Sequence, residues 1–179
     1  MEESKYDIII LRYKSKEEIS MYLYLVQHGE AKKEEEDPAR GLTERGRADV
    51  TQVASLIQKM ENNVSRILHS GKTRAMQTAQ IIGKFINCED GIFESEGLAP
   101  MDEPLFWARR IDGLNEDIML VGHLPHMAKL SGLLLCGNQE KACIDFKMGG
   151  VVCYKRFDDG RWAVEWMVVP EMARYCMRV

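Results

Sequence analysis

The sequence predicts a layered α/β domain whose sheet is largely parallel at its centre and antiparallel at one edge. Three apolar runs, each ending in small residues and followed by helical spacing, indicate strands that alternate with helices; they span 21–26, 64–69 and 118–121. Two later runs, 149–157 and 161–169, alternate with period two around Asp158-Asp159-Gly160, which is typical of an antiparallel hairpin.

Length and composition are consistent with one domain. The chain has 179 residues, 45% of them hydrophobic, which is enough to bury a core. We therefore expect a single domain over 21–179, preceded by an N-terminal extension over 1–20. The extension contains a strand-like run at 7–13 and a capping-box pattern at 15–18, and we assign it no catalytic part.

Charge and cysteine content exclude several classes of protein. A formal net charge of −4 argues against a general nucleic-acid or anionic-membrane surface. The five cysteines are odd in number and none follow a CxxC spacing, so we expect reduced structural thiols and a cytoplasmic location. No apolar run reaches the length of a membrane span, and we expect no signal peptide.

The elements follow in order from the first strand. A charged loop at 32–40 leads to Thr43, which we expect to cap a helix that carries apolar residues at helical spacing and ends at Asn62-Asn63. A second helix starts at about Lys72 behind the strand 64–69. The apolar residues predicted to face the core are, in the first helix, Val50, Val53, Ala54, Ile57 and Met60, and in the second, Ala75, Ala79, Ile82 and Ile86.

The second half is predicted in the same way. Residues 91–94 suggest a short strand, 97–100 a turn and 103–111 a helix. A further amphipathic helix follows the strand 118–121 and ends near Cys136-Gly137.

Chemically active side chains follow the three strands that precede helices. His28 comes directly after the first strand, Arg74 falls in the first turn of the helix after the second, and His123 follows the third. Because the carboxyl ends of parallel strands meet at one edge of a sheet, we expect the three residues to lie together. An imidazole can attack phosphorus, while a guanidinium and helix amides can hold phosphoryl oxygens. The pattern therefore predicts a phosphoryl site.

Other motifs carry less weight. Gly71-Lys72-Thr73 resembles the end of a P-loop, but Arg66 stands where that loop needs its first glycine. His123 and His126 lack a third metal ligand nearby, so we expect no metal. His69 lies within a strand run and is interpreted as a core or near-site histidine.

Trp162 and Trp166 lie at alternate positions of a strand and are interpreted as packing residues rather than a ligand platform.

Four ordered motifs resemble the histidine phosphatase superfamily. Leu25-Val-Gln-His-Gly-Glu30 is similar to its Arg-His-Gly signature, and Leu42-Thr-Glu-Arg-Gly46 to its Leu-Thr-x-x-Gly element. Ser70-Gly-Lys-Thr-Arg-Ala-Met-Gln-Thr-Ala79 resembles its Ser-Pro-x-x-Arg-Ala-x-Gln-Thr segment, with Gly71 in place of proline, and Val121-Gly-His-Leu-Pro125 resembles its second-histidine motif. The small size and Gly97-Leu-Ala-Pro100 resemble the SixA-type phosphohistidine phosphatase branch.

The resemblance implies a three-layer phosphoglycerate mutase-like fold with helices on both faces of the sheet. It further implies that His28 is the nucleophile and that Arg74 and His123 bind the phosphoryl group, with Arg40 as an additional phosphate contact. Such phosphatases need no metal, so no cofactor is expected. The leaving-group acid has only candidates, Glu30 and Asp102.

The chain departs from the family at Gln27, which stands where the family has arginine. Glutamine still donates hydrogen bonds to phosphate but brings no charge and no bidentate fork. A loss of about 1–2 kcal/mol would slow turnover by roughly five- to thirtyfold. Lys32 or Lys33 could restore part of the positive field.

The expected activity is removal of phosphoryl groups from protein phosphohistidine through a phosphohistidine intermediate. Two alternatives remain open: a phosphomonoesterase for a small phosphorylated metabolite, and a non-catalytic phosphoryl-binding module.

Overall fold

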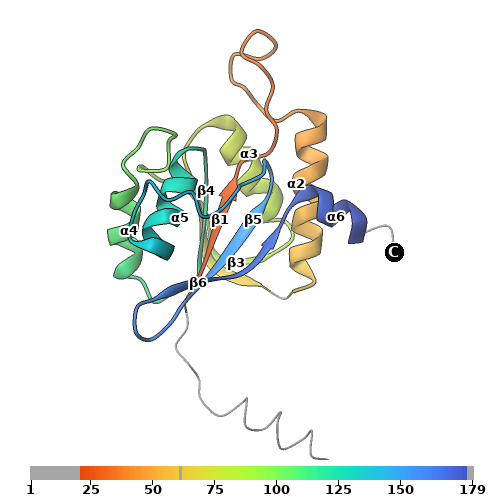
Figure 1. The fold of residues 1–179 in the computed structure, drawn as a ribbon. Helices are drawn as coiled ribbons and strands as arrows, with labels where there is room; N and C mark the ends of the chain where they lie inside the picture. Colours follow the sequence, from red (N-terminus) through yellow and green to blue (C-terminus); the bar gives the residue numbers. More distant parts are fainter. Residues whose placement is uncertain (1–20, 61, 177–179) are drawn as a thin grey trace, which may run out of the picture.

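The computed structural model describes residues 21–60 and 62–176, and their six strands form one sheet (Figure 1). The order across the sheet is β3-β2-β4-β1-β5-β6. The strands are β1 (Met21–Gln27), β2 (Asn63–His69), β3 (Asn87–Glu94), β4 (Ile118–Gly122), β5 (Val151–Arg156) and β6 (Trp162–Val168). The first four run parallel, β5 is antiparallel to β1, and β6 is antiparallel to β5. The predicted parallel centre and antiparallel edge are thus confirmed.

Helices cover both faces of the sheet, as expected for three layers (Figure 1). They are α2 (Glu44–Gln58), α3 (Thr73–Ile82), α4 (Pro104–Asp112), α5 (His126–Cys136) and α6 (Pro170–Cys176). The core is divided by the sheet, since side chains of β1 alternate between its faces. Tyr24 and Val26 pack with the helices α2 and α3, whereas Leu23 and Leu25 pack with α4 and α5.

The helix α2 begins as predicted and ends earlier. The Thr43 hydroxyl accepts a hydrogen bond from the Gly46 amide at 2.9 Å, which caps the helix. The helix stops at Gln58 with Lys59 as its C-cap, not at Asn62-Asn63. The Asn62 side-chain amide, which lies beyond the helix, instead donates to the Ile57 carbonyl in the last turn at 3.0 Å.

Two further boundaries and one helix differ from the sequence predictions. Ile86 is buried, but it lies beyond the end of α3. The strand β3 starts at Asn87 rather than at 91, because it pairs with the whole length of β2. The helix α6 was not predicted; it packs on α2, where Ala173 is buried and Arg174 forms an ion pair with Asp49. The predictions for residues 1–20 lie outside the described residues.

A bulge in β6 separates the two tryptophans. Cys153 pairs with Trp166 and Tyr154 pairs with Val164, so Glu165 is an extra residue on β6. Trp162 therefore packs against one half of the core and Trp166 against the other. Trp166 lies with its ring centroid 5.8 Å from that of Tyr24, which supports the packing role expected for both.

Candidate active site

The three residues expected at one edge of the sheet do lie there. His28 follows β1, His123 follows β4, and Arg74 sits in the first turn of α3, which begins just beyond the end of β2. The His28 amide donates to the Gly122 carbonyl at 3.1 Å and extends the β1–β4 pairing into the site. The rings of His28 and His123 lie 4.7 Å apart, centroid to centroid.

The hydrogen bonds of His28 define its protonation state. Arg74 Nε, which can only donate, lies 3.2 Å from His28 Nε2, so this nitrogen carries the lone pair. The other nitrogen, Nδ1, therefore carries the proton and donates to the Gly29 carbonyl at 2.7 Å. Burial is the main cause that lowers the pKa of His28 to about 4; the bond to the Gly29 carbonyl opposes this shift, and the charges of Arg74 and Arg40 add to it. His28 is thus a neutral imidazole at neutral pH, and its Nε2 lone pair, which accepts from Arg74, can act as a nucleophile.

Thr78 fixes His28 and Arg74 relative to each other. Its hydroxyl accepts from the Gly29 amide at 3.0 Å and donates to the Arg74 carbonyl at 2.7 Å. The side chain is fully buried. One turn of α3 is thereby attached to the loop that carries His28. A neighbouring bond, from the Leu42 amide to Gln77 Oε1 at 2.8 Å, attaches the same helix to the start of α2.

His123 is held by Ser70, the first residue after β2. Ser70 Oγ lies 2.6 Å from His123 Nε2, while His123 Nδ1 is buried without a hydrogen-bond partner. Burial is the main cause that lowers the pKa of His123 to about 3, with smaller contributions from any positive charge on His28 and from Arg74 and Lys72. His123 is therefore also neutral, so it can donate or accept a hydrogen bond at a bound phosphoryl group but brings no charge to it.

Arg40 lies across an open cavity from Arg74. Its backbone is left-handed, with φ 51°, and its amide donates to the Asp37 carbonyl at 2.7 Å. A non-glycine residue in this conformation is strained and needs surrounding contacts to hold it. The cavity has a volume of about 380 Å³ and is lined by Glu34, Pro38, Ala39, Arg40, Gly71, Lys72, Thr73 and Arg74. Burial is the main cause that lowers the pKa of Arg74, and the positive charge of Arg40 lowers it as well. The two guanidinium groups therefore interact electrostatically.

Gln27 is the last residue of β1 and lies beside Gly122 of β4. Its carbonyl accepts from the Gly149 amide at 2.9 Å, which brings the start of β5 to this edge. The side chain is only 6% exposed, and its Oε1 has no hydrogen-bond partner. A buried amide oxygen without a hydrogen-bond partner lowers the stability of the fold. Gln27 therefore places a polar side chain at this edge of the sheet at a cost in stability.

The two candidate acids are engaged elsewhere. Glu30 Oε1 accepts from the Thr43 hydroxyl at 2.8 Å and so supports the cap of α2. Asp102 Oδ2 accepts from the Ala99 amide at 2.8 Å and closes the turn before α4. These bonds give both carboxylates a local structural role.

The motifs set aside from sequence have ordinary roles in the structure. Gly71 has φ 77°, and a Cβ there would meet Glu94 Oε1 at 2.3 Å, so the Gly71-Lys72-Thr73 turn is shaped by close packing. His69 Nδ1 accepts from the Gly71 amide at 3.1 Å, as expected of a near-site histidine.

His126 is fully buried, neither of its ring nitrogens has a partner, and burial lowers its pKa to about 4. Within residues 21–60 and 62–176, no three histidine, cysteine or carboxylate side chains are grouped as metal ligands.

Ser70 and Thr78 received no role from the sequence. Both fall within the segment 70–79 that resembles a family motif, and that resemblance was the signal that could have identified them. Their contacts depend on the distances between β2, α3 and the loop after β1, which a single sequence does not supply.

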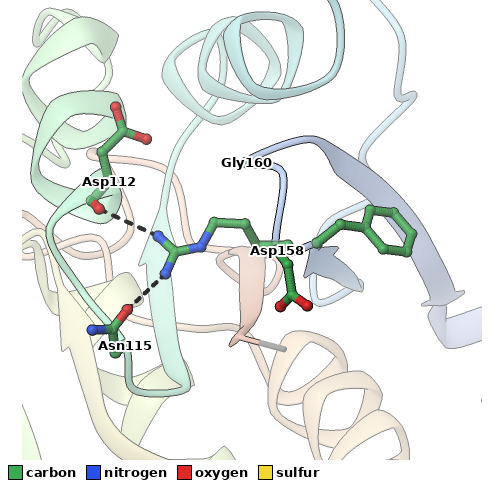
Figure 2. Close-up of a pocket in the computed structure, with 6 residues that line it drawn as sticks. Asp112, Asn115, Asp158 and Gly160 are labelled. Atoms are coloured by element: carbon green, nitrogen blue, oxygen red, sulfur yellow. Dashed lines mark hydrogen bonds between the residues drawn. The ribbon is translucent and has the colours of Figure 1, made fainter. Parts of the chain in front are cut away.

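A larger cavity, of about 460 Å³, opens at the other end of the sheet around Arg156 (Figure 2). Arg156 pairs with Met21, at the opposite end of β1 from His28. Its guanidinium donates to the carbonyls of Ile111 at 3.1 Å and Leu114 at 2.5 Å, and to Asn115 Oδ1 at 3.1 Å. These bonds satisfy carbonyls at the end of α4, so Arg156 caps a helix here.

The chain is similar to known proteins in part of its sequence and in its fold. Residues 23–102 match the family model of the histidine phosphatase superfamily (branch 1). No curated protein sequence shows significant similarity to the chain. The match begins inside β1 and ends just before α4, so it includes His28, Arg40 and Arg74.

Three solved structures illustrate the likeness in fold. The protein histidine phosphatase SixA complexed with tungstate has 21% identity and a TM-score of 0.75, covering 84% of this chain and 97% of that one. A protein from Agrobacterium tumefaciens assigned as phosphohistidine phosphatase SixA has 24% identity and a TM-score of 0.70, covering 84% and 98%. A phosphoserine phosphatase from Entamoeba histolytica has 17% identity and a TM-score of 0.60, covering 85% and 98%.

The chain therefore has the phosphoglycerate mutase-like α/β fold, and the resemblance to the histidine phosphatase superfamily is confirmed by the family model. At these identities the solved structures establish the fold alone. In the part of the chain that the structure describes, no helix is long and apolar enough to cross a membrane.

Proposed function

We propose that the chain is a phosphatase that removes phosphoryl groups from phosphohistidine in proteins through a phosphorylated His28. The observation that carries the proposal is the unprotonated Nε2 of His28, which accepts a hydrogen bond from Arg74, a residue that lines an open cavity. A neutral nucleophile beside a fixed cation suits attack on an anionic phosphoryl group.

The reaction would proceed in two displacements. His28 Nε2 attacks phosphorus, the phosphorus–nitrogen bond of the substrate breaks, and the departing imidazole takes up a proton from water. Water then attacks the phosphorus of phospho-His28, and inorganic phosphate leaves as the imidazole is restored. Arg74 would hold the equatorial oxygens in both steps, with His123, Gln27 and Arg40 as further phosphate contacts.

Phosphohistidine is favoured over a phosphate ester because both candidate acids already form local hydrogen bonds. A phosphoramidate loses its imidazole readily, so its cleavage depends less on a leaving-group acid than cleavage of a phosphate ester does. Glu30 is bonded to Thr43 and Asp102 to Ala99. The cavity is open and its lining is polar and charged, which suits a side chain presented on a protein surface.

One observation favours a second candidate, a phosphomonoesterase for a small metabolite. Glu96, Asp102 and Glu103 line a separate cavity of about 360 Å³. A carboxylate there that reached a substrate oxygen could serve as the acid that an ester needs. The phosphoserine phosphatase among the similar structures shows that this fold also accommodates such a substrate.

The deciding experiment compares phosphate release from a phosphohistidine-bearing protein, phosphoserine and a simple aryl phosphate. We expect release from phosphohistidine at the highest kcat/KM. His28→Ala should abolish release, and rapid quenching of the unmodified protein should trap acid-labile phosphate on the peptide that contains residue 28.

A matched control is His69→Asn, which replaces a histidine outside the His28–Arg74–His123 group and can still accept a bond from the Gly71 amide. This variant should retain most of the activity. Faster release from phosphoserine would support the second candidate instead. Binding of tungstate with no release from any substrate would indicate a non-catalytic phosphoryl-binding module.

A further inference from the structure

Two surface cysteines at and beyond the C-terminal end of α5 have their sulfur atoms in contact. Cys136 Sγ and Cys143 Sγ lie 3.2 Å apart, and both side chains are exposed. Both are free thiols. Among the described residues, Cys176 is the other exposed cysteine, whereas Cys153 is buried and Cys88 partly buried.

The contact is produced by a folded loop. Cys136 is the last residue of α5, and the left-handed Gly137, with φ 64°, turns the chain back on the helix. The Gly137 amide donates to the Leu133 carbonyl at 2.8 Å, and the Asn138 amide to the Gly132 carbonyl at 3.2 Å. The loop 137–143 is thus tied to the last turns of α5.

Further contacts hold the second cysteine in place. Asn138 Oδ1 accepts from the Glu140 amide at 2.9 Å, and the Asn138 carbonyl accepts from the Lys141 amide at 3.1 Å. A Cβ at Gly132 would lie 2.5 Å from the Lys141 carbonyl oxygen, so the loop packs directly on the helix backbone. Cys143 Sγ also donates to the Lys141 carbonyl at 3.5 Å.

We propose that Cys136 and Cys143 form a redox site that closes to an intramolecular disulfide on reaction with a low-molecular-weight disulfide such as oxidised glutathione. A disulfide bond is about 2.05 Å long, so the sulfur atoms need to approach by roughly 1 Å. Rotation of two exposed side chains supplies a movement of this size. Exposure also makes both thiols accessible to a dissolved disulfide.

The exchange is balanced in thiols and protons. One cysteine thiolate attacks a sulfur of oxidised glutathione, which forms a mixed disulfide and releases one glutathione thiolate. The second cysteine then attacks the protein-bound sulfur, forms the bond between Cys136 and Cys143, and releases the second glutathione. Two protein thiols are oxidised while one glutathione disulfide is reduced to two thiols.

The disulfide would join α5 to the segment that returns to the active-site edge. Beyond Cys143, Phe146 is buried in the same half of the core as Met127 and Leu130 of α5. Gly149 then donates to the carbonyls of Gln27 at 2.9 Å and His28 at 3.2 Å. A disulfide that closes the loop 136–143 lowers the conformational entropy of the unfolded chain. We expect it to leave these contacts of the folded chain in place.

The test is treatment of the full chain with oxidised glutathione, followed by alkylation, intact mass and peptide mapping. We expect a species about 2 Da lighter than the reduced chain before alkylation, with the peptides of Cys136 and Cys143 cross-linked. Its Tm should rise by roughly 2–8 °C and return on reduction with dithiothreitol.

Single variants separate closure from simple modification. Cys136→Ser and Cys143→Ser should each stop at a stable glutathione adduct on the remaining cysteine of the pair. Cys176→Ser removes the other exposed thiol and should close the disulfide as the unmodified chain does. Glutathione adducts that persist on both Cys136 and Cys143 in the unmodified chain, or no reaction at either, would overturn the proposal.

Discussion

Arg74 donates its Nε hydrogen to His28 Nε2, the nitrogen that we propose attacks phosphorus, across 3.2 Å. The Nε–H of the guanidinium is thus satisfied by the nucleophile. An incoming phosphoryl oxygen is a stronger, anionic acceptor, so it would take over this donor and leave Nε2 facing phosphorus. Binding of the phosphoryl group to Arg74 would then release His28 Nε2 for attack in the same step.

Replacing Arg74 by lysine tests this exchange. Lysine keeps the charge but loses the Nε donor and the planar fork. Losing one charge-assisted bond of about 1.5–3 kcal/mol should lower kcat/KM by roughly 10- to 150-fold, as measured by phosphate release from a phosphohistidine protein. Arg109→Lys, at an exposed position of α4, is the matched control and should leave the rate unchanged. Full activity in Arg74→Lys would contradict the exchange.

Thr78→Val should weaken both stability and catalysis. Valine has nearly the same shape but removes the bonds to the Gly29 amide and the Arg74 carbonyl. Leaving the Gly29 amide buried without a partner costs about 1–3 kcal/mol, which urea unfolding would measure. The activity should fall as well, because His28 and Arg74 lose their common support.

Thr78→Ser is the control for this change. Serine keeps the hydroxyl and loses only a buried methyl group, which costs about 1 kcal/mol. Its kcat/KM should stay close to that of the unmodified chain. If valine and serine lowered the rate equally, the hydroxyl would have no positioning role.

Gln27 stands where the histidine phosphatase pattern has arginine, and two opposite substitutions define its role. Gln27→Arg restores a charged donor and should raise kcat/KM by roughly five- to thirtyfold. Gln27→Leu removes the amide and should lower it by roughly 2- to 12-fold, the value of one neutral hydrogen bond. The leucine variant should unfold no more easily, since it also removes the unpaired Oε1. Equal rates in all three proteins would show that residue 27 does not contact the phosphate.

The fold was predictable because its elements are locally encoded. The Thr43 cap, the hairpin around Asp158-Asp159-Gly160 and the run of β1 each follow from nearby residues, and each is present. The helix α6 was missed because it is short and depends on packing against α2, including the ion pair between Arg174 and Asp49. The bulge at Glu165 likewise reflects the pairing of two strands rather than the sequence of one.

The grouping of the three candidate residues was predictable, but their contacts were not. The rule that parallel strands end at one edge brought His28, Arg74 and His123 together correctly. It gave no information on Ser70 and Thr78, whose contacts cross between elements. Gly71 shows how a departure from the family can be structural, because its φ of 77° is closed to proline. The loop after β2 therefore has a different backbone here from one that carries proline.

The protonation of the buried histidines gives the last prediction. His28, His69, His123 and His126 are the four histidines of the chain, so their ring signals can be assigned from single substitutions. Burial lowers the pKa of His28 to about 4, that of His123 to about 3 and that of His126 to about 4. An NMR titration should therefore show no charging of these three rings above pH of about 5. A His28 signal that titrated near the ordinary value of about 6.5 would contradict the neutral nucleophile.

The same shifts make stability depend on pH in a definite direction. Below about pH 6.5 the unfolded chain binds protons on these histidines, whereas the folded chain does not until about pH 4. The free energy of unfolding should therefore fall as the pH drops from 6.5 towards 4, and His126 alone can account for up to about 2 kcal/mol between pH 6.5 and 5. His126→Leu, which removes a fully buried ring with two unpaired nitrogens, should be at least as stable at pH 7 and should lose less stability at pH 5. Urea unfolding of both proteins at the two pH values measures the difference, and parallel losses would mean that His126 accepts a proton in the folded state.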